Sequence, residues 1–202
     1  GDAGPAALDW AVLEGAESWG VTVLQAEAEM DAGPVWAEAR FPLRRGRKAS
    51  VYRHEVTEAA VIAVKQSVTR FIAGDFTPQR VSGKALPLMK QQDRVIDWSV
   101  NGSAAILARL NAADGFPGVA DSLFGEACHL FDAWPEASLR GEPGSLIGRR
   151  ETAILRATVD GAVWIGHVRR EDEHALKLPA TLALAAELAG LSDLPELPED
   201  DD

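Results

Sequence analysis

Asp31 is the residue from which chemistry in this chain would be argued first, because it stands at a break between two patterned segments. Apolar and polar side chains alternate from Val21 to Met30 and again from Val35 to Phe41, which predicts two β-strands. The intervening Asp-Ala-Gly-Pro predicts a tight turn with a carboxylate at its tip. Such a carboxylate can take part in proton transfer, but Asp is also common in turns because its side chain bonds nearby backbone amides.

Other catalytic and metal-binding patterns are absent from the sequence. The four histidines form neither an HxxxH nor an HExxH pair, and Cys128 and His129 are adjacent, so in a strand they would point to opposite faces. We therefore interpret the histidines as structural or surface residues and predict no metal site. There is no G-x-S-x-G elbow of a serine hydrolase, and the glycines have the spacing of neither a P-loop nor G-x-G-x-x-G.

Length and composition indicate an ordinary globular protein. The length of 202 residues is enough for one large domain or two small ones. The composition, 47% hydrophobic and 25% charged, is ordinary for a globular protein. No apolar run approaches the roughly 18 residues that would span a bilayer. Cys128 is the only cysteine, which fits a reducing compartment. We therefore expect a cytoplasmic protein that does not bind a membrane. The first residues have neither a signal-peptide pattern nor an initiator Met, and we expect a piece of a longer protein.

The charge is distributed unevenly along the chain. Residues 1–89 hold 10 Lys and Arg against 11 Asp and Glu, whereas residues 90–202 hold 10 against 20. A surface that binds a phosphate backbone needs an excess of basic residues, because binding depends largely on their contacts with phosphates. The sequence therefore predicts that the second half binds no nucleic acid.

The elements that would position Asp31 can be predicted from periodicity and end signals. Residues 5–15 indicate a short helix that Gly15 can end, followed by the two strands. A basic loop follows at residues 44–48, and then a helix that Thr57 can cap and Gly74 can end. Apolar residues recur along this helix at spacings of three and four, at Val61, Val64, Val68 and Phe71.

The second half has a different texture. A helix is predicted at residues 103–113, then several short strands, with a hairpin turn at Asp160-Gly161. One helix with several short strands suggests a small β-barrel of the OB type. Residues 180–191 favour a helix, and the Pro-punctuated acidic end favours a tail or linker.

A longer pattern surrounds Asp31 and covers most of residues 4–120. Its members are Gly4-Pro5, Trp10-Ala11, Gly20-Val21-Thr22, Asp31-Ala32-Gly33, Thr57-Glu58, the helix up to Gly74, Asp93 with Ile96-Asp97-Trp98, and Phe116-Pro117-Gly118. In this order they resemble the folate-dependent formyltransferases, which include methionyl-tRNA formyltransferase, the sugar-nucleotide formyltransferases and 10-formyltetrahydrofolate dehydrogenase. Residues 1–11, 84–98 and 176–180 are similar to the branch of this family that matures nickel–iron hydrogenases, although Ala3 stands where an Arg is usual.

The resemblance implies a fold and a domain organisation. The fold class would be α/β followed by mainly β, with a partial Rossmann-like formyltransferase domain, including its β-hairpin, and an OB-like β-barrel C-terminal domain. The predicted parts are the C-terminal part of the catalytic domain at 1–82, a linker at 83–92, the OB-like domain at 93–190, and an acidic tail or severed linker at 191–202.

The resemblance also implies a reaction. A formyl group would move from N10-formyltetrahydrofolate to an acceptor, which in the hydrogenase-maturation branch is coenzyme A. A crotonase-like domain on the same parent chain would then release carbon monoxide for the hydrogenase maturation machinery. Methionyl-tRNA formyltransferase and the sugar-nucleotide formyltransferases are the alternatives within the family. A scaffold module with a decayed folate pocket is the alternative outside enzymes.

The resemblance assigns roles to residues of the turn. The family uses an Asn and a His, from a segment upstream of the Gly-Pro motif, together with the Asp that maps to Asp31. The Asn and a protonated His would stabilise the oxyanion of the tetrahedral intermediate, and the carboxylate would keep the His charged and help to relay a proton. Glu29, Met30, Ala32 and Gly33 would line the pterin pocket. Because the Asn and the His do not map onto this sequence, we expect it to be inactive alone.

Overall fold

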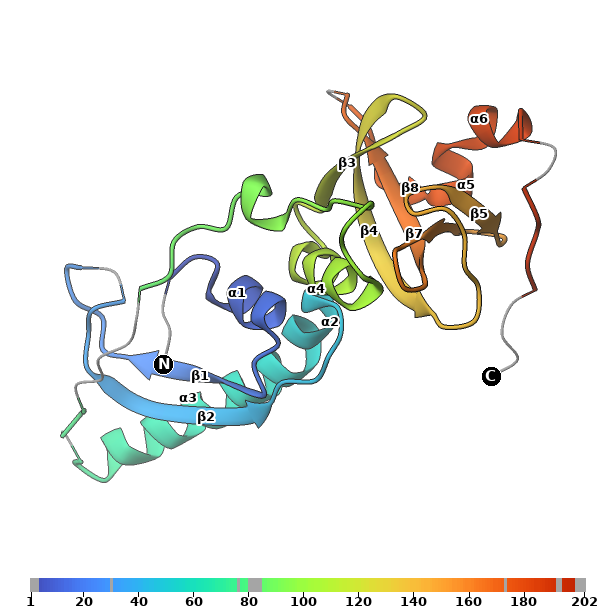
Figure 1. Ribbon diagram of the computed structural model, residues 1–202. Helices are drawn as coiled ribbons and strands as arrows, with labels where there is room; N and C mark the ends of the chain where they lie inside the picture. Colours follow the sequence, from blue (N-terminus) through green and yellow to red (C-terminus); the bar gives the residue numbers. More distant parts are fainter. Residues whose placement is uncertain are drawn as a thin grey trace. The chain divides into compact units, whose positions relative to one another are not determined.

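The chain divides into two compact units, one up to Met89 and one from Lys90 (Figure 1). The computed structural model describes residues 4–29, 31–75, 77–79, 85–172, 174–191 and 194–198. Each unit is described by itself below. Among the described residues, no helix combines the length and the apolar character that crossing a membrane requires.

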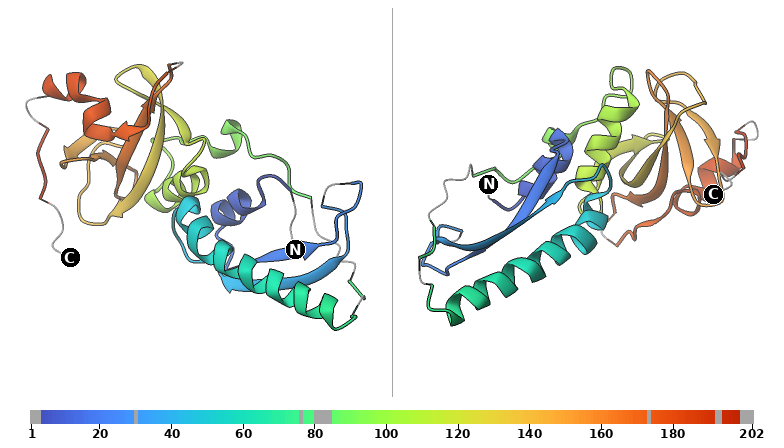
Figure 2. Two further views of the ribbon diagram at one scale, coloured as in Figure 1. Left: turned by 180° about the vertical axis from the view of Figure 1, so that it is seen from behind. Right: turned by 90° about the horizontal axis from the view of Figure 1, so that it is seen from below.

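The first unit is a β-hairpin with helices. Its elements are α1 (Ala7–Glu14), β1 (Ser18–Leu24), β2 (Val35–Pro42), α2 (Lys48–Val51), a π-helical turn (Tyr52–Val56) and α3 (Thr57–Ile72). The strands β1 and β2 pair antiparallel, and α3 runs along the hairpin (Figure 2). The short first helix is confirmed, and it ends as predicted at Gly15, whose φ is 68°.

The tight turn predicted between the two strands is wrong. β1 ends at Leu24 and β2 begins at Val35, so residues 25–34 form a loop rather than a turn. The register already shifts between Val23 and Leu24. Beyond that point the alternating residues are mainly Ala and Glu, which have low β-propensity and little apolar surface to bury. The alternation therefore continues in the sequence after the ladder has ended.

The long helix is confirmed, but its start and its buried face differ from the prediction. The chain is helical from Lys48 onward, so Thr57 does not cap an end, and its Oγ1 donates to the carbonyl oxygen of Tyr52 at 3.0 Å. The buried residues of α3 are Ala59 and Ala63, which pack on the hairpin and are 4% and 0% exposed. The apolar stripe instead lies at the surface, with exposures of 49% for Val61, 52% for Val64, 51% for Val68 and 61% for Phe71.

The second unit is an antiparallel sheet with helices. Its elements are a 3-10 turn (Gln91–Arg94), α4 (Ser103–Ala113), β3 (Val119–Leu123), β4 (Glu126–Glu136), β5 (Leu146–Arg149), β6 (Ile154–Ala157), β7 (Ala162–Arg170), β8 (Leu178–Pro179), α5 (Ala180–Ala183) and α6 (Ala185–Ala189). The strand order is β3-β4-β7-β6-β5, with β8 also paired to β7. Within the described residues no strand pairing joins β3 to β5, so the element predicted as a barrel is an antiparallel sheet here.

The main core of the second unit lies between α4 and the sheet. Ile106 and Leu110 of α4 are 0% and 1% exposed and belong to one apolar cluster with Leu130 and Ile165 of the sheet. The start of α4 is held by the turn between β6 and β7, where the backbone N–H of Ser103 donates to Oδ1 of Asp160 at 2.7 Å. The predicted hairpin turn at Asp160-Gly161 is confirmed.

Candidate functional site

The loop at residues 25–34 closes at its neck, where β1 and β2 meet. The backbone N–H of Gln25 donates to the carbonyl oxygen of Pro34 at 2.9 Å. A β-carbon added to Gly33 would lie only 1.8 Å from the carbonyl oxygen of Gln25. The two arms can therefore approach this closely only with glycine at position 33.

Asp31 lies in this loop in a backbone conformation that L-residues rarely adopt. Its φ is 59°, in the left-handed region that Asp tolerates better than bulkier residues. Asp31, Glu29 and Ala32 are exposed and Gly33 is half-buried. The structure thus brings these four predicted site residues into one loop but does not enclose them. Met30, which is also predicted to line the pterin pocket, and Ala3 lie outside the described residues.

Arg70 anchors the strand that leaves the loop, a role that no sequence pattern indicates. From near the end of α3, its Nη1 donates to the carbonyl oxygen of Trp36 and its Nε donates to Oδ2 of Asp75 at 2.7 Å. Its Nη2 donates to the carbonyl oxygen of Thr77 at 3.2 Å. One guanidinium therefore ties α3, the start of β2 and the following segment together. Val35 is fixed from the other side, since it exchanges backbone hydrogen bonds with Gln79.

The Arg70–Asp75 pair has an electrostatic consequence. The hydrogen bond from Arg70, followed by those from Thr77, holds the pKa of the Asp75 carboxyl well below its usual range. The same bond raises the pKa of Arg70. Both side chains therefore stay charged through the neutral range, so the anchor of β2 does not depend on pH there.

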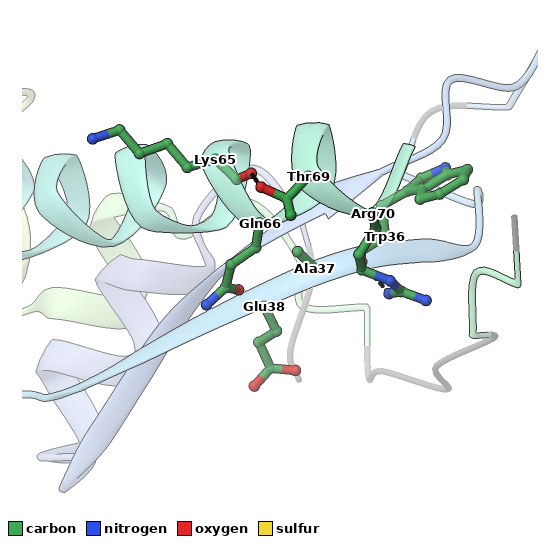
Figure 3. Close-up of a pocket in the computed structure, with 7 residues that line it drawn as sticks. All are labelled: Trp36, Ala37, Glu38, Lys65, Gln66, Thr69 and Arg70. Carbon is green, nitrogen blue, oxygen red and sulfur yellow. Dashed lines mark hydrogen bonds between the residues drawn. The ribbon is translucent and has the colours of Figure 1, made fainter. Parts of the chain in front are cut away.

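A groove lies between β2 and α3, next to this anchor. It has a volume of about 520 Å³. Its lining residues, drawn in Figure 3, are Trp36, Ala37, Glu38, Lys65, Gln66, Thr69 and Arg70. The guanidinium carbon of Arg70 lies 5.8 Å from the centre of the Trp36 ring. The groove does not include Asp31, so the loop and the groove are separate features of the first unit.

The Gly-Pro motif near the start of the chain has a packing role. Gly4 has φ 115°, and a β-carbon there would lie 2.3 Å from the carbonyl oxygen of Leu86. The indole Nε1 of Trp10 donates to the neighbouring carbonyl oxygen of Pro87 at 2.9 Å. These motif residues thus hold the segment at 86–87 against the start of the first unit.

Arg156, whose side chain is 12% exposed, lines a second, smaller cavity in the second unit. Arg156 donates to Asp121 at 3.2 Å, and its guanidinium carbon lies 4.1 Å from the centre of the Trp98 ring. Trp98 Nε1 also donates to Asp121, at 2.7 Å. The cavity of about 310 Å³ is lined by Ser122, Leu123, Phe124, Gly144, Leu146, Arg156 and Leu191. Trp98 and Trp164 are 8% and 0% exposed, so both indoles belong to the core of the second unit.

The Cys128 thiol of the second unit is buried, and the ring of His167 is paired with a carboxylate. Burial, reinforced by the charge of Asp121, raises the pKa of the Cys128 thiol to about 12. The thiol is therefore not a nucleophile near neutral pH. His167 Nδ1 lies 3.0 Å from Oδ2 of Asp132, a residue with φ 57°. Among the described residues, no group of three or more His, Cys, Asp and Glu side chains could hold a metal ion.

Sequence comparisons relate the chain to formyltransferases. The family described as "Formyl transferase, C-terminal domain" matches residues 88–184. Hydrogenase maturation factor HoxX of Bradyrhizobium diazoefficiens is 50% identical over 204 residues, which cover 96% of this chain and 35% of HoxX. Methionyl-tRNA formyltransferase of Dechloromonas aromatica is 27% identical over 197 residues, which cover 96% of this chain and 62% of that enzyme.

Comparison with solved structures gives the same relationship. HypX from Aquifex aeolicus, solved in complex with tetrahydrofolic acid, superposes with a TM-score of 0.92 and 41% identity over 100% of this chain and 36% of HypX. The N-formyltransferase from Helicobacter canadensis shares the fold, with a TM-score of 0.56 and 15% identity over 87% of this chain and 62% of that one. The chain thus spans about a third of the length of HoxX and HypX, with 35% and 36% covered.

Proposed function

The chain belongs to the formyltransferase family, and from this premise we propose that it is the part of a HoxX-type enzyme that helps to transfer a formyl group from N10-formyltetrahydrofolate. The observation that carries the proposal is the 0.92 TM-score to HypX, a protein solved with tetrahydrofolic acid, at 41% identity. The 50% identity to HoxX supports the same assignment.

The two units have different parts in this proposal. Residues 1–82 form the C-terminal part of a Rossmann-like catalytic domain, residues 83–92 a linker, and residues 93–190 the C-terminal domain of a formyltransferase. Residues 191–202 form an acidic tail or linker. The family match at 88–184 and the antiparallel sheet of the second unit support the C-terminal assignment.

The acceptor in this proposal is the thiol of coenzyme A. The sulfur attacks the formyl carbon, the bond between that carbon and N10 breaks, and the thiol proton passes to N10. A crotonase-like domain on the same parent chain then releases carbon monoxide from formyl-coenzyme A for hydrogenase maturation. HoxX is named as a hydrogenase maturation factor, which supports coenzyme A over tRNA or a sugar nucleotide as the acceptor.

Asp31 is the proposed catalytic residue of this chain. Its carboxylate keeps the family's His charged and holds the water through which the thiol proton travels, while that His and the family's Asn stabilise the oxyanion. Glu29, Met30, Ala32 and Gly33 line the pterin side. The closed neck of the loop supports the proposal, because a proton relay needs its carboxylate held in place.

Two other functions are open to test. A methionyl-tRNA formyltransferase would need a basic surface to bind tRNA, but residues 90–202 hold 20 acidic and 10 basic residues. Filter binding of initiator tRNA separates this alternative from the proposed function. A decayed folate-binding or scaffold module predicts that Asp31 has no catalytic role.

The deciding experiment compares Asp31 with Asn in a parent chain that also contains the family's Asn and His. Asp31→Asn should lower kcat by several orders of magnitude and leave folate affinity nearly unchanged, since the lost interaction acts on the proton in transit. Glu38→Gln is the matched control, because that carboxylate lies on β2 outside the loop. Unchanged turnover in Asp31→Asn would favour the scaffold alternative.

A further inference from the structure

The outer edge of β5 carries a segment of the chain that the sequence assigns to its acidic tail. β5 is the last strand in the sheet order, and its other edge pairs with β6. The backbone N–H of Arg149 donates to the carbonyl oxygen of Pro195 at 3.0 Å, and the N–H of Leu197 donates back to Arg149 at 2.8 Å. Arg149 and Glu196 thus form a parallel bridge. The tail segment therefore pairs with the edge of the sheet at one isolated bridge.

A glycine in β5 makes a seat for one side chain of this segment. A β-carbon added to Gly148 would lie 2.6 Å from Cδ1 of Leu197, while the next neighbour, in Leu155, would be at an ordinary 3.7 Å. Leu197 packs on the smaller apolar cluster, which includes Leu155 and Trp164. Leu194, three residues earlier, packs against the main core of the unit. Two leucines therefore fix the segment to two clusters.

Charge adds little to this contact. Arg149 and Glu196 are 3.9 Å apart and their side chains are 36% and 70% exposed, so the ion pair is screened by solvent. Pro195 and Pro198 lack a backbone N–H and limit how far the ladder can extend. Recognition thus depends on backbone pairing and on the leucine seats, which is how strand addition selects peptides in general.

We propose that the outer edge of β5, with the space at Gly148, is a peptide-binding site for an extended Leu-Pro-acidic-Leu segment, and that residues 194–197 of this chain are its occupant. This site, called the β5-edge site below, recognises the segment through contacts that do not require a covalent connection. It therefore fixes the point at which the chain leaves the sheet, and it accepts the same sequence as a separate peptide once its own segment is displaced.

The test removes residues 194–197 from the β5-edge site in the full 202-residue chain. Leu197→Asp removes the side chain from its seat, and a labelled peptide with the sequence of residues 191–202 is then titrated by fluorescence anisotropy. The peptide should bind Leu197→Asp at least tenfold more tightly than it binds the unsubstituted chain, in which residues 194–197 already occupy the β5-edge site. Because the peptide and the second unit are both acidic, binding should be unchanged or stronger when the salt concentration is raised.

The control for the site is Gly148→Ala in the Leu197→Asp chain. The added methyl group fills only the seat of Leu197, so circular dichroism should be unchanged while peptide affinity falls at least tenfold. A peptide carrying the same Leu197→Asp change should bind neither chain. Equal binding of the peptide to the unsubstituted chain and to Leu197→Asp would overturn the proposal. Peptide binding that Gly148→Ala leaves intact would also overturn it.

Hydrogen exchange tests the occupant without relying on a peptide. In the unsubstituted chain the amides of Arg149 and Leu197 should exchange at least tenfold more slowly than in Leu197→Asp, because both donate in the parallel bridge. Fast exchange of both amides in the unsubstituted chain would refute the docking. A dimer that dissociates on Leu197→Asp substitution would refute the proposal that residues 194–197 occupy the site of their own chain. In such a dimer the tail of one copy would fill the β5-edge site of another.

Discussion

Gly33 and Gln25 face each other across the neck of the loop that carries Asp31, and a β-carbon on Gly33 would lie 1.8 Å from the carbonyl oxygen of Gln25. The geometry of the loop therefore depends on a hydrogen in place of a side chain. This relationship links the Asp-Ala-Gly motif of the sequence to the position of its carboxylate.

Gly33→Ala should open this neck. The methyl group cannot fit against the Gln25 carbonyl, so the hydrogen bond from Gln25 to Pro34 should lengthen or break. We expect the Gln25 amide to exchange with solvent at least tenfold faster, as measured by nuclear magnetic resonance. Ala32→Ser, at the exposed neighbouring position, should leave that rate unchanged. An unaltered Gln25 amide in Gly33→Ala would contradict this account of the loop.

Arg70→Lys should loosen the anchor of β2 although it keeps the charge. A lysine cannot bond Trp36, Asp75 and Thr77 at once, because its ammonium lacks the planar fork of a guanidinium. We expect the thermal unfolding midpoint to fall by a few degrees. Arg40→Lys, whose pair with Glu38 is exposed, should change the midpoint little. Equal midpoints for the two variants would refute the anchoring role.

The same anchor should weaken in acid. The pKa of Asp75 is lowered in the folded protein from its ordinary value of 3.8, chiefly by Arg70. A carboxyl with a lowered pKa contributes stability above its unfolded-state pKa and loses it as the pH falls through the folded-state pKa. The difference in midpoint between the unsubstituted chain and Asp75→Asn should therefore be constant at neutral pH and shrink below about pH 4. A difference at pH 2 that is as large as the difference at neutral pH would contradict the assignment.

Asp160→Ala should destabilise the second unit from a distance. Its carboxylate accepts from the N–H of Ser103 at the start of α4 and from Oγ1 of Thr158 in its own turn. These bonds lower the pKa of Asp160, the Ser103 bond most of all. Urea unfolding followed by circular dichroism should show a lower unfolding midpoint for Asp160→Ala. Asp160→Asn should lower the midpoint less, because its amide oxygen can still accept a hydrogen bond. Asp172→Ala, which removes only a local turn bond, is the control.

The 202-residue chain should not make formyl-coenzyme A by itself. In the proposed function the oxyanion is stabilised by an Asn and a His that do not map onto these 202 residues, so the intermediate would lack its stabilising groups. Chromatography of a mixture with formyltetrahydrofolate and coenzyme A should detect no thioester above the uncatalysed rate. Turnover by the chain alone would contradict the proposed division of the active site.

The sequence predicted elements well where one pattern and one end signal agree. The helix ending at Gly15, the helix up to Gly74 and the turn at Asp160-Gly161 all follow from local rules. The strand extension to Met30 failed because alternation of Ala and Glu gives a period without apolar surface to bury. The periodicity of α3 predicted a helix but not which face the hairpin would cover, and here that face is formed by Ala59 and Ala63.

Contacts between distant residues could not be read from the sequence. Nothing near Arg70 indicates that it bonds the carbonyl of Trp36, which lies 34 residues earlier in the chain. Leu197 lies between two prolines, a context typical of linkers, and its packing depends on Gly148 in β5. The local pattern drew attention to Asp31, but its proposed role came from resemblance to a family, and the shape of its loop came from the structure.

The outward apolar stripe of α3 has a practical consequence for work with this chain. Val61, Val64, Val68 and Phe71 are each about half exposed or more, on a helix whose small residues already cover the hairpin. Such a strip should take up an environment-sensitive dye and promote self-association as the protein is concentrated. Glutamate at Val64 or Val68 should then reduce light scattering without disturbing the alanine contacts beneath.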